Sequence, residues 1–195
     1  MRRVQAFTLA ALAFAGSGAG EAGGLAPRSS FSARSGEIVV PAFVNGSGPF
    51  LFLLDTGASH SAVSEELAGA VGAPAVARTK VMSTIGHDLR PVVRLDRLNV
   101  GPVTASGVLA SVVRRDDIDP QGRIQGLIGQ DVLASRRYTL DYRQRQVEWL
   151  TDAGQAMGGV KLRLHIDDGR SLVELPQDGS IVRLVPDSAA DGLVL

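Results

Sequence analysis

An acidic residue follows a strongly apolar run in the first third of the chain. Asp55 comes directly after Phe-Leu-Phe-Leu-Leu at residues 50–54, and it is followed by Thr56, Gly57, Ala58 and Ser59. A carboxylate that a buried strand carries inward must be paired, hydrogen-bonded or protonated. Such arrangements are kept mainly where a function needs them. Asp55 is therefore the first residue to consider for chemistry.

The residues after Asp55 suit a carboxylate that activates water. The Thr56 hydroxyl can lock a turn, Gly57 lets the backbone approach the carboxylate, and small side chains at 58 and 59 leave room for a neighbouring copy of the loop. Two such loops face to face would hold two carboxylates about 3 Å apart, with one proton shared between them. One would act as base and the other as acid. On these residues alone, a structural Asp that opens a turn stays an open interpretation.

The surrounding elements predict one compact, mostly β domain over residues 36–150. With 23 Gly and 9 Pro in 195 residues, the chain favours strands and turns over a helical bundle. Pro41 suggests an edge or a bulge in the first strand, and a short helix begins at Ser64. A second short helix follows an apolar strand end in residues 126–135. Strands are predicted at residues 37–44, 50–54, 80–83, 90–98, 106–113, 138–142 and 146–150.

Four ordered segments resemble the retropepsin-like aspartic protease family, and in particular its bacterial single-lobe members. The segments are VNGSGPFLFLLDTGASHSAVS, MSTIGH, GLIGQDVL and YTLDYRQRQVEWL. The resemblance covers nearly all of residues 36–150. It implies a closed, antiparallel, barrel-like acid protease lobe with two short helices. It also implies an aspartic-type endopeptidase that acts on a peptide or protein substrate without a cofactor or metal.

The resemblance assigns roles by position. Asp55 would be the catalytic residue, and the active-site loop would be supported by Thr56, Gly57, Ala58 and Ser59. A flap over the cleft would comprise Ser83, Thr84, Ile85, Gly86 and His87. A segment beneath the catalytic loop would be Leu127, Ile128 and Gly129. Viral members usually have Arg after that glycine, whereas this chain has Gln130, so an ion pair known from them would be missing.

A complete site needs a second Asp, for which the sequence offers two sources. The main expectation is a homodimer in which Asp55 meets its own counterpart across a two-fold axis. The rival is Asp187, because an Asp-Gly-Ser turn at residues 178–180 precedes it as Asn-Gly-Ser at residues 45–47 precedes Asp55. Two facts count against this rival: Ala189 replaces the turn glycine, and only eight residues follow Asp187.

The two ends of the chain are expected to lie outside this lobe. Residues 1–20 have the pattern of a signal peptide, with Arg2 and Arg3 before a short apolar run that is too short to span a bilayer. Residues 21–35 are expected to be a linker, and the protein to be exported, periplasmic or secreted. Residues 151–195 form a C-terminal extension: a truncated second lobe, a dimer-forming strand pair or the start of a PDZ-like module.

Composition excludes several other classes. The chain has 20 basic and 20 acidic residues, which argues against a nucleic-acid partner, and it has no Cys for a disulfide or thiolate site. Its three His show no metal-ligand spacing, and the acidic residues at 116–119 are expected to form a solvated turn. Two alternatives to a peptidase stay open. One is a catalytically inactive peptide-binding or scaffold protein with the same fold, and the other is an unrelated ligand-binding β domain with Asp55 on its surface.

Overall fold

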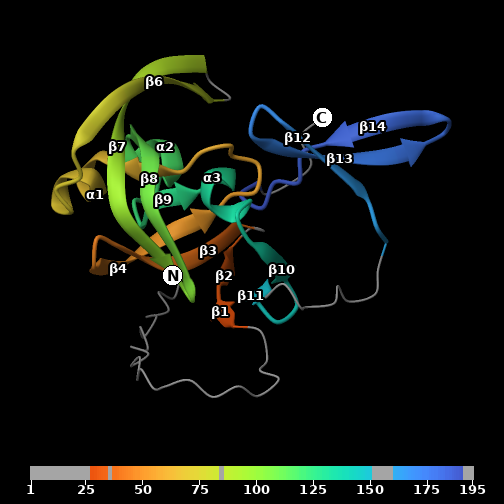
Figure 1. Ribbon diagram of the computed structural model, residues 1–195, viewed down its shortest axis with the longest axis horizontal. Helices are drawn as coiled ribbons and strands as arrows, with labels where there is room; N and C mark the ends of the chain where they lie inside the picture. Colours follow the sequence, from red (N-terminus) through yellow and green to blue (C-terminus); the bar gives the residue numbers. More distant parts are fainter. Residues whose placement is uncertain (1–26, 35–36, 84–85, 151–159, 191–195) are drawn as a thin grey trace, which may run out of the picture.

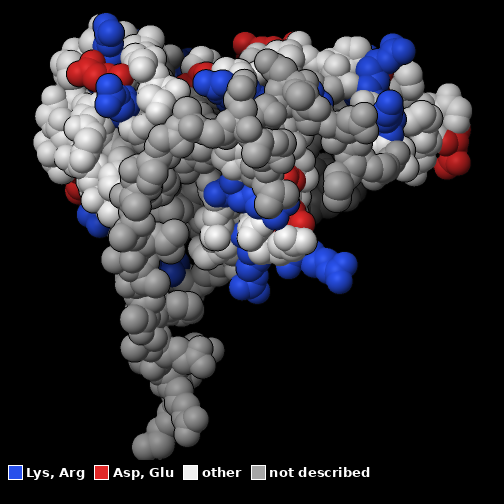
Figure 2. Space-filling model, turned by 60° about the horizontal axis from the view of Figure 1, so that its bottom comes forward, with Lys and Arg blue, Asp and Glu red and all other residues white. Residues whose placement is uncertain are grey.

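The computed structural model describes residues 27–34, 37–83, 86–150 and 160–190. The protein is mostly β, as predicted, and the described residues form three sheets and three short helices (Figure 1). None of the helices in this part of the chain has the length and apolar character needed to cross a membrane. On the face drawn in Figure 2, basic side chains stand out along the lower edge, and acidic ones lie beside them.

The main sheet has eight strands that curl into a roughly barrel-like ring. In sheet order these are β2 (Ser32–Arg34), β3 (Glu37–Val44), β4 (Ser47–Leu54), β9 (Ile124–Ile128), β5 (Ala62–Ser64), β8 (Val103–Val113), β7 (Gly86–Val100) and β6 (Ala75–Ser83). The ring closes because β3 also pairs with β7. Most neighbours are antiparallel, as expected, but β4 pairs with β9 and β5 with β8 in parallel. Pro41 lies where the partner of β3 changes from β2 to β7, next to a bulge.

The apolar run before Asp55 is the central strand β4, and it is buried on both faces. Phe52 and Leu54 belong to the main core inside the ring, whereas Leu53 faces a second small cluster with Val39 and Ile124. Leu51 at the outer end is 38% exposed. Burial of each large apolar side chain contributes about 1.5–3 kcal/mol, so this strand is firmly anchored. Asp55 therefore directly follows a firmly packed strand.

The helices are short and follow strands. The predicted two are α1 (Glu65–Ala70) and α3 (Gln130–Leu133). The third, α2 (Arg115–Ile118), occupies the segment expected to be a solvated turn. That expectation is wrong for Asp119, which is buried and accepts backbone N–H bonds from Gln121, Arg123 and Ile124. The turn at residues 119–122 is indicated by its Asp, Pro and Gly, but the sequence does not show that its Asp is buried.

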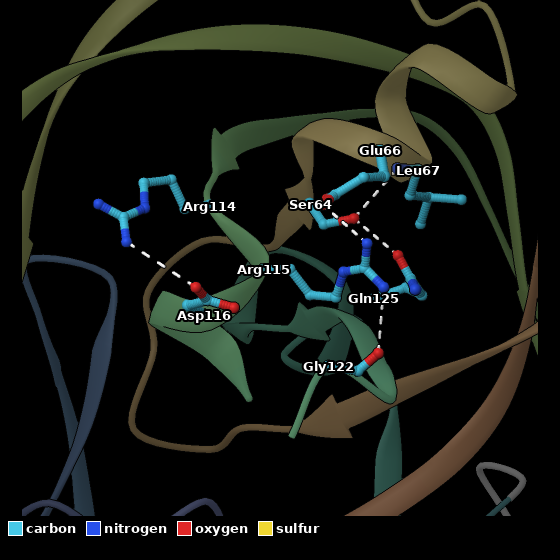
Figure 3. Close-up of polar contacts among 8 residues, drawn as sticks. All are labelled: Ser64, Glu66, Leu67, Arg114, Arg115, Asp116, Gly122 and Gln125. Carbon is cyan, nitrogen blue, oxygen red and sulfur yellow. Dashed lines mark hydrogen bonds and ion pairs between the residues drawn. The ribbon is translucent and has the colours of Figure 1, made fainter. Parts of the chain in front are cut away.

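Polar contacts join α1 to the loop around α2 (Figure 3). The Ser64 hydroxyl accepts the Leu67 N–H at 3.0 Å and donates to Gln125 Oε1 at 2.7 Å. Arg115 donates to Glu66 Oε1 at 2.8 Å and to the Gly122 carbonyl at 3.2 Å. These contacts close the side of the ring where β5 and β9 pair antiparallel.

Two smaller sheets complete the described part. One contains β1 (Arg28–Ser30), β11 (Gln146–Leu150) and β10 (Arg137–Asp141), and the other contains β12 (Arg163–Asp167), β13 (Arg170–Gln177) and β14 (Ser180–Leu184). Strands β1 and β2 lie in the segment predicted to be a linker. They were missed because Phe31, which is buried between them, is the one large apolar residue of residues 27–34. The sheet β12–β14 lies in the C-terminal extension.

Candidate active site

Asp55 lies where β4 ends, and its own loop orients its carboxylate. The Asp55 N–H donates to the Ile128 carbonyl at 2.9 Å, which ties the residue to the end of β9. Asp55 Oδ1 accepts the N–H groups of Gly57 and Ala58, both at 2.9 Å. Two donors on one oxygen stabilise the ionised form and fix the direction of the carboxylate. The sequence reasoning placed this turn and the approach of the Gly57 N–H to the carboxylate, but it did not identify the Ala58 N–H as a second donor.

A second loop, after β14, repeats the same arrangement. Asp187 Oδ1 accepts the N–H groups of Ala189 at 2.8 Å and Ala190 at 3.2 Å. Asp187 is more exposed than Asp55, whose exposure is intermediate. The contact between the two loops is close, since a Cβ built on Gly57 would lie 2.8 Å from Asp187 Cγ. The chain therefore brings two carboxyl-bearing turns together.

Thr56 and Ser188 lock these two loops by reciprocal hydrogen bonds. The Thr56 hydroxyl donates to the Pro186 carbonyl at 2.6 Å and accepts the Ser188 N–H at 3.0 Å. In return, the Ser188 hydroxyl accepts the Thr56 N–H at 3.1 Å and donates to the Leu54 carbonyl. Both side chains are buried. The sequence indicated Ser188 as part of a degenerate second half-site at residues 187–190, but it singled out neither Pro186 nor the bonds between Ser188 and Thr56.

The electrostatics of the site favour one proton on the pair. The pKa of Asp55 is raised to about 6, mainly by burial and next by the negative charge of Asp187. The N–H bonds from Gly57 and Ala58 lower the pKa, whereas a hydrogen bond with the Asp187 side chain raises it. Two close carboxyls titrate as a unit, so the pair can hold a proton in mildly acidic solution.

Helix α3 supports the loop from below. The Gln130 N–H donates to the Ala58 carbonyl at 2.9 Å, and the Asp131 N–H donates to the Ser59 carbonyl at 3.2 Å. The Gln130 side chain donates from Nε2 to the Thr56 carbonyl at 2.9 Å. A Cβ on Gly129 would lie 2.6 Å from the His60 carbonyl carbon, so this glycine permits the close approach. At position 130, where viral members of the resembled family usually have Arg, the neutral amide of Gln130 bonds to the loop.

The predicted flap coincides with a hairpin. β6 and β7 pair up to Met82↔His87 and Ser83↔Gly86, and Thr84 and Ile85 lie outside the described residues. A covering role for this hairpin stays a prediction. On another side, the β12–β13 turn reaches the site, since a Cβ on Gly169 would lie 3.1 Å from Ser59 Cβ.

The described residues also bear on two other kinds of chemistry, a Ser–His nucleophile and a metal site. Ser59 Oγ lies 3.0 Å from His60 Nδ1, but His60 is exposed. Within the described ranges, His, Asp and Glu side chains form no group of three or more that could hold a metal ion.

Comparison with known proteins identifies a related family over part of the chain. Residues 40–132 match the family model described as aspartyl protease, which supports the resemblance to retropepsin-like aspartyl proteases. A solved structure described as a retropepsin-like aspartic protease from Rickettsia conorii is similar at 20% identity and a TM-score of 0.46. The similarity covers 63% of this chain and 87% of that chain. No curated protein matches the chain. The family match includes Asp55 and its loop, and Asp187 lies beyond it.

Proposed function

We propose that this chain, a member of the retropepsin-like aspartyl protease family over residues 40–132, is an aspartic-type peptidase whose two acids come from the same chain. Asp55 and Asp187 would be the pair. The observation that carries the proposal is the reciprocal bonding of Thr56 and Ser188, because it holds the two acid-bearing loops against each other. The same contact favours the within-chain source of the second acid over the homodimer expected from the sequence.

The reaction follows from the protonation of the pair. Asp55, whose pKa is raised, holds the shared proton and donates it to the oxygen of the scissile carbonyl. Asp187 takes a proton from water, and the water oxygen bonds to the carbonyl carbon to give a tetrahedral diol. As the C–N bond breaks, the proton on Asp187 passes to the leaving nitrogen, and a diol proton returns to Asp55. The products are a carboxylic acid and an amine, and both acids regain their starting states.

The substrate would be an extended peptide. A strand-like segment that passes between the acid pair and the β6–β7 hairpin can pair its backbone with the edge of the hairpin. Export to the periplasm or beyond also stays part of the proposal, on the pattern of residues 1–20. Those residues lie outside the described part of the chain.

The test is to neutralise each acid separately. Asp55→Asn and Asp187→Asn should each lower peptide hydrolysis by about 10²–10⁴-fold, because each removes a proton-transfer group. Asp116→Asn is the matched control, since this exposed carboxylate lies on α2 and pairs with Arg114 (Figure 3). Circular dichroism checks that all three variants fold.

The outcomes separate the alternatives. Full activity in Asp187→Asn with loss in Asp55→Asn would overturn the within-chain pair and favour the homodimer. A folded wild-type protein that binds peptides but cleaves none, from acid to neutral pH, would favour the inactive peptide-binding scaffold. Mixing the two Asn variants should restore no activity, because each chain then lacks one acid of its own pair.

A further inference from the structure

We propose that Gln130 is a positioning residue, whose buried amide fixes the peptide unit that holds Asp55. The inference rests on the proposed function, because it concerns how the same acid pair is kept in place. Gln130 does not reach the reacting atoms in the described contacts. It acts through the backbone of the loop at residues 56–58.

The Thr56–Gly57 peptide unit is held at both ends. Its carbonyl accepts Gln130 Nε2 at 2.9 Å, and its N–H donates to Asp55 Oδ1 at 2.9 Å. A peptide unit is planar, so its carbonyl and N–H turn together. Rotation that breaks the bond to Gln130 therefore also weakens the bond to Asp55. Bonds in series also polarise one another, which strengthens the pair of contacts.

Gln130 itself is well fixed. It is 7% exposed, and its backbone N–H donates to the Ala58 carbonyl, two peptide units further along the loop. Its side chain also lies against Tyr138, where hydrogen bonding with Gln130 partly offsets the rise that burial causes in the pKa of the Tyr138 hydroxyl. The Tyr138 ring packs against Trp149 with 6.0 Å between centroids. The amide is thus held between β10 and the catalytic loop.

The neutrality of Gln130 matters for the acids. The described contacts place five titratable groups around this region: Asp187 beside Gly57, Asp131 bonded to Ser61, Tyr142 near Asp187, Tyr138 behind the amide, and His60 beside Ser59. His60 is the one basic group among these five, and its exposed ring contacts Ser59. An amide can orient the loop without the opposite charge that would lower the pKa of Asp55. A cation at position 130 would make the same hydrogen bond and also stabilise the ionised acid.

Two substitutions at this position should move the titration of Asp55 in opposite directions. Gln130→Met keeps the side-chain volume but removes the donor, so the Gly57 bond weakens and the pKa of Asp55 should rise by about half a unit or more. Gln130→Lys keeps a donor and adds a positive charge, so the pKa should fall. The measurement is the titration of the Asp55 carboxyl carbon by NMR in the folded protein, assigned by comparison with Asp55→Asn.

Gln125→Met is the matched control. It makes the same exchange near the start of β9 and loses the 2.7 Å bond with Ser64 (Figure 3), whereas Asp55 is bonded to Ile128 at the end of that strand. The Asp55 titration should not move in this variant. An unmoved titration in folded Gln130→Met, or shifts of the same sign in the Met and Lys variants, would overturn the proposal. If Gln130→Lys does not fold, the test rests on the Asp55 titration in Gln130→Met compared with that in Gln125→Met.

The readout also separates this inference from the proposed function. NMR titration needs no turnover, so an inactive wild-type protein with the expected shifts would refute the peptidase proposal and leave the positioning role standing. An active protein whose Asp55 titration does not change with substitutions at position 130 would refute the positioning role and leave the peptidase proposal standing. In an active protein, the pH profile of kcat/KM should shift with the titration.

Discussion

At the scale of single residues, Gly57 and Ala189 explain why Asp187 was ranked below a homodimer. The sequence reasoning expected a glycine at both positions of the repeated turn. Neither residue has a positive φ, so backbone conformation does not demand glycine. Gly57 is needed because Asp187 lies against it, whereas Ala189 packs beside the small apolar cluster of Val39 and Leu53. This asymmetry depends on tertiary contacts, which a turn motif does not contain.

The burial of Asp55 predicts a pH-dependent cost to stability. Its pKa is about 6 in the folded protein and 3.8 in an unperturbed chain, so the folded state binds more protons between these values. The unfolding free energy from this group is therefore highest below pH 4 and falls as pH rises through 6. Asp55→Asn cannot ionise and should escape this loss. Relative to wild type, it should gain about 1–3 kcal/mol between pH 3.5 and pH 7.5.

Urea unfolding of both proteins at the two pH values measures this gain. Asp116→Asn serves as the control, because it removes an exposed carboxylate that belongs to neither acid-bearing loop. A constant offset between Asp55→Asn and wild type would show that Asp55 titrates normally in the folded state.

At the scale of elements, the sequence predicted those strands whose positions depend on the pattern of apolar residues. The strands at residues 37–44 and 146–150 match β3 and β11 to the residue: Gly36 and Asn45-Gly46 bound the first, and alternating apolar residues mark the second. Shorter elements were missed: β1 and β2 rely on backbone pairing, and α2 is a single turn closed by Asp119. Hydrogen bonds made at a distance in sequence decide these elements. They leave little trace in local composition.

The cap of α1 gives a prediction at this scale. Ser64 is fully buried, accepts the Leu67 N–H and donates to Gln125. Ser64→Ala removes the cap and leaves two polar groups without their partner, so the protein should lose about 1–3 kcal/mol of unfolding free energy. Thermal or urea unfolding measures the loss. Ser135→Ala is a suitable comparison, because that hydroxyl donates to one carbonyl at a partly buried position and its removal should cost less. Equal losses in the two variants would argue against the double role of Ser64.

At the scale of the whole molecule, the loop that follows the C-terminal sheet is bonded to the ring through Ser188. The Ser188 carbonyl accepts the Ile38 N–H at 3.2 Å, in addition to the bonds between Ser188 and Thr56. The sequence reasoning recognised the repeated turn in residues 178–187 but could not place it, because nothing in the sequence fixes how distant segments dock. The position of the Asp187 loop is thus decided by its contacts with the ring, which local sequence patterns do not contain.

A site that is complete within one chain predicts activity that does not depend on assembly. Specific activity should stay constant as the protein is diluted, and sedimentation at the same concentrations should show that the smallest species is active. An active site formed by two copies of the chain would lose activity as the copies dissociate. A fall in specific activity that parallels dissociation would therefore contradict the within-chain pair and restore the homodimer.

The distance along the chain between the two locking residues has a bearing on biosynthesis. Thr56 and Ser188 are 132 residues apart. At ribosomal speeds of about 5–20 residues per second, the second acid appears on the order of ten seconds after the first. If both acids are required, a nascent polypeptide cannot cut its neighbours before the β13–β14 hairpin and the loop with Asp187 have emerged and docked.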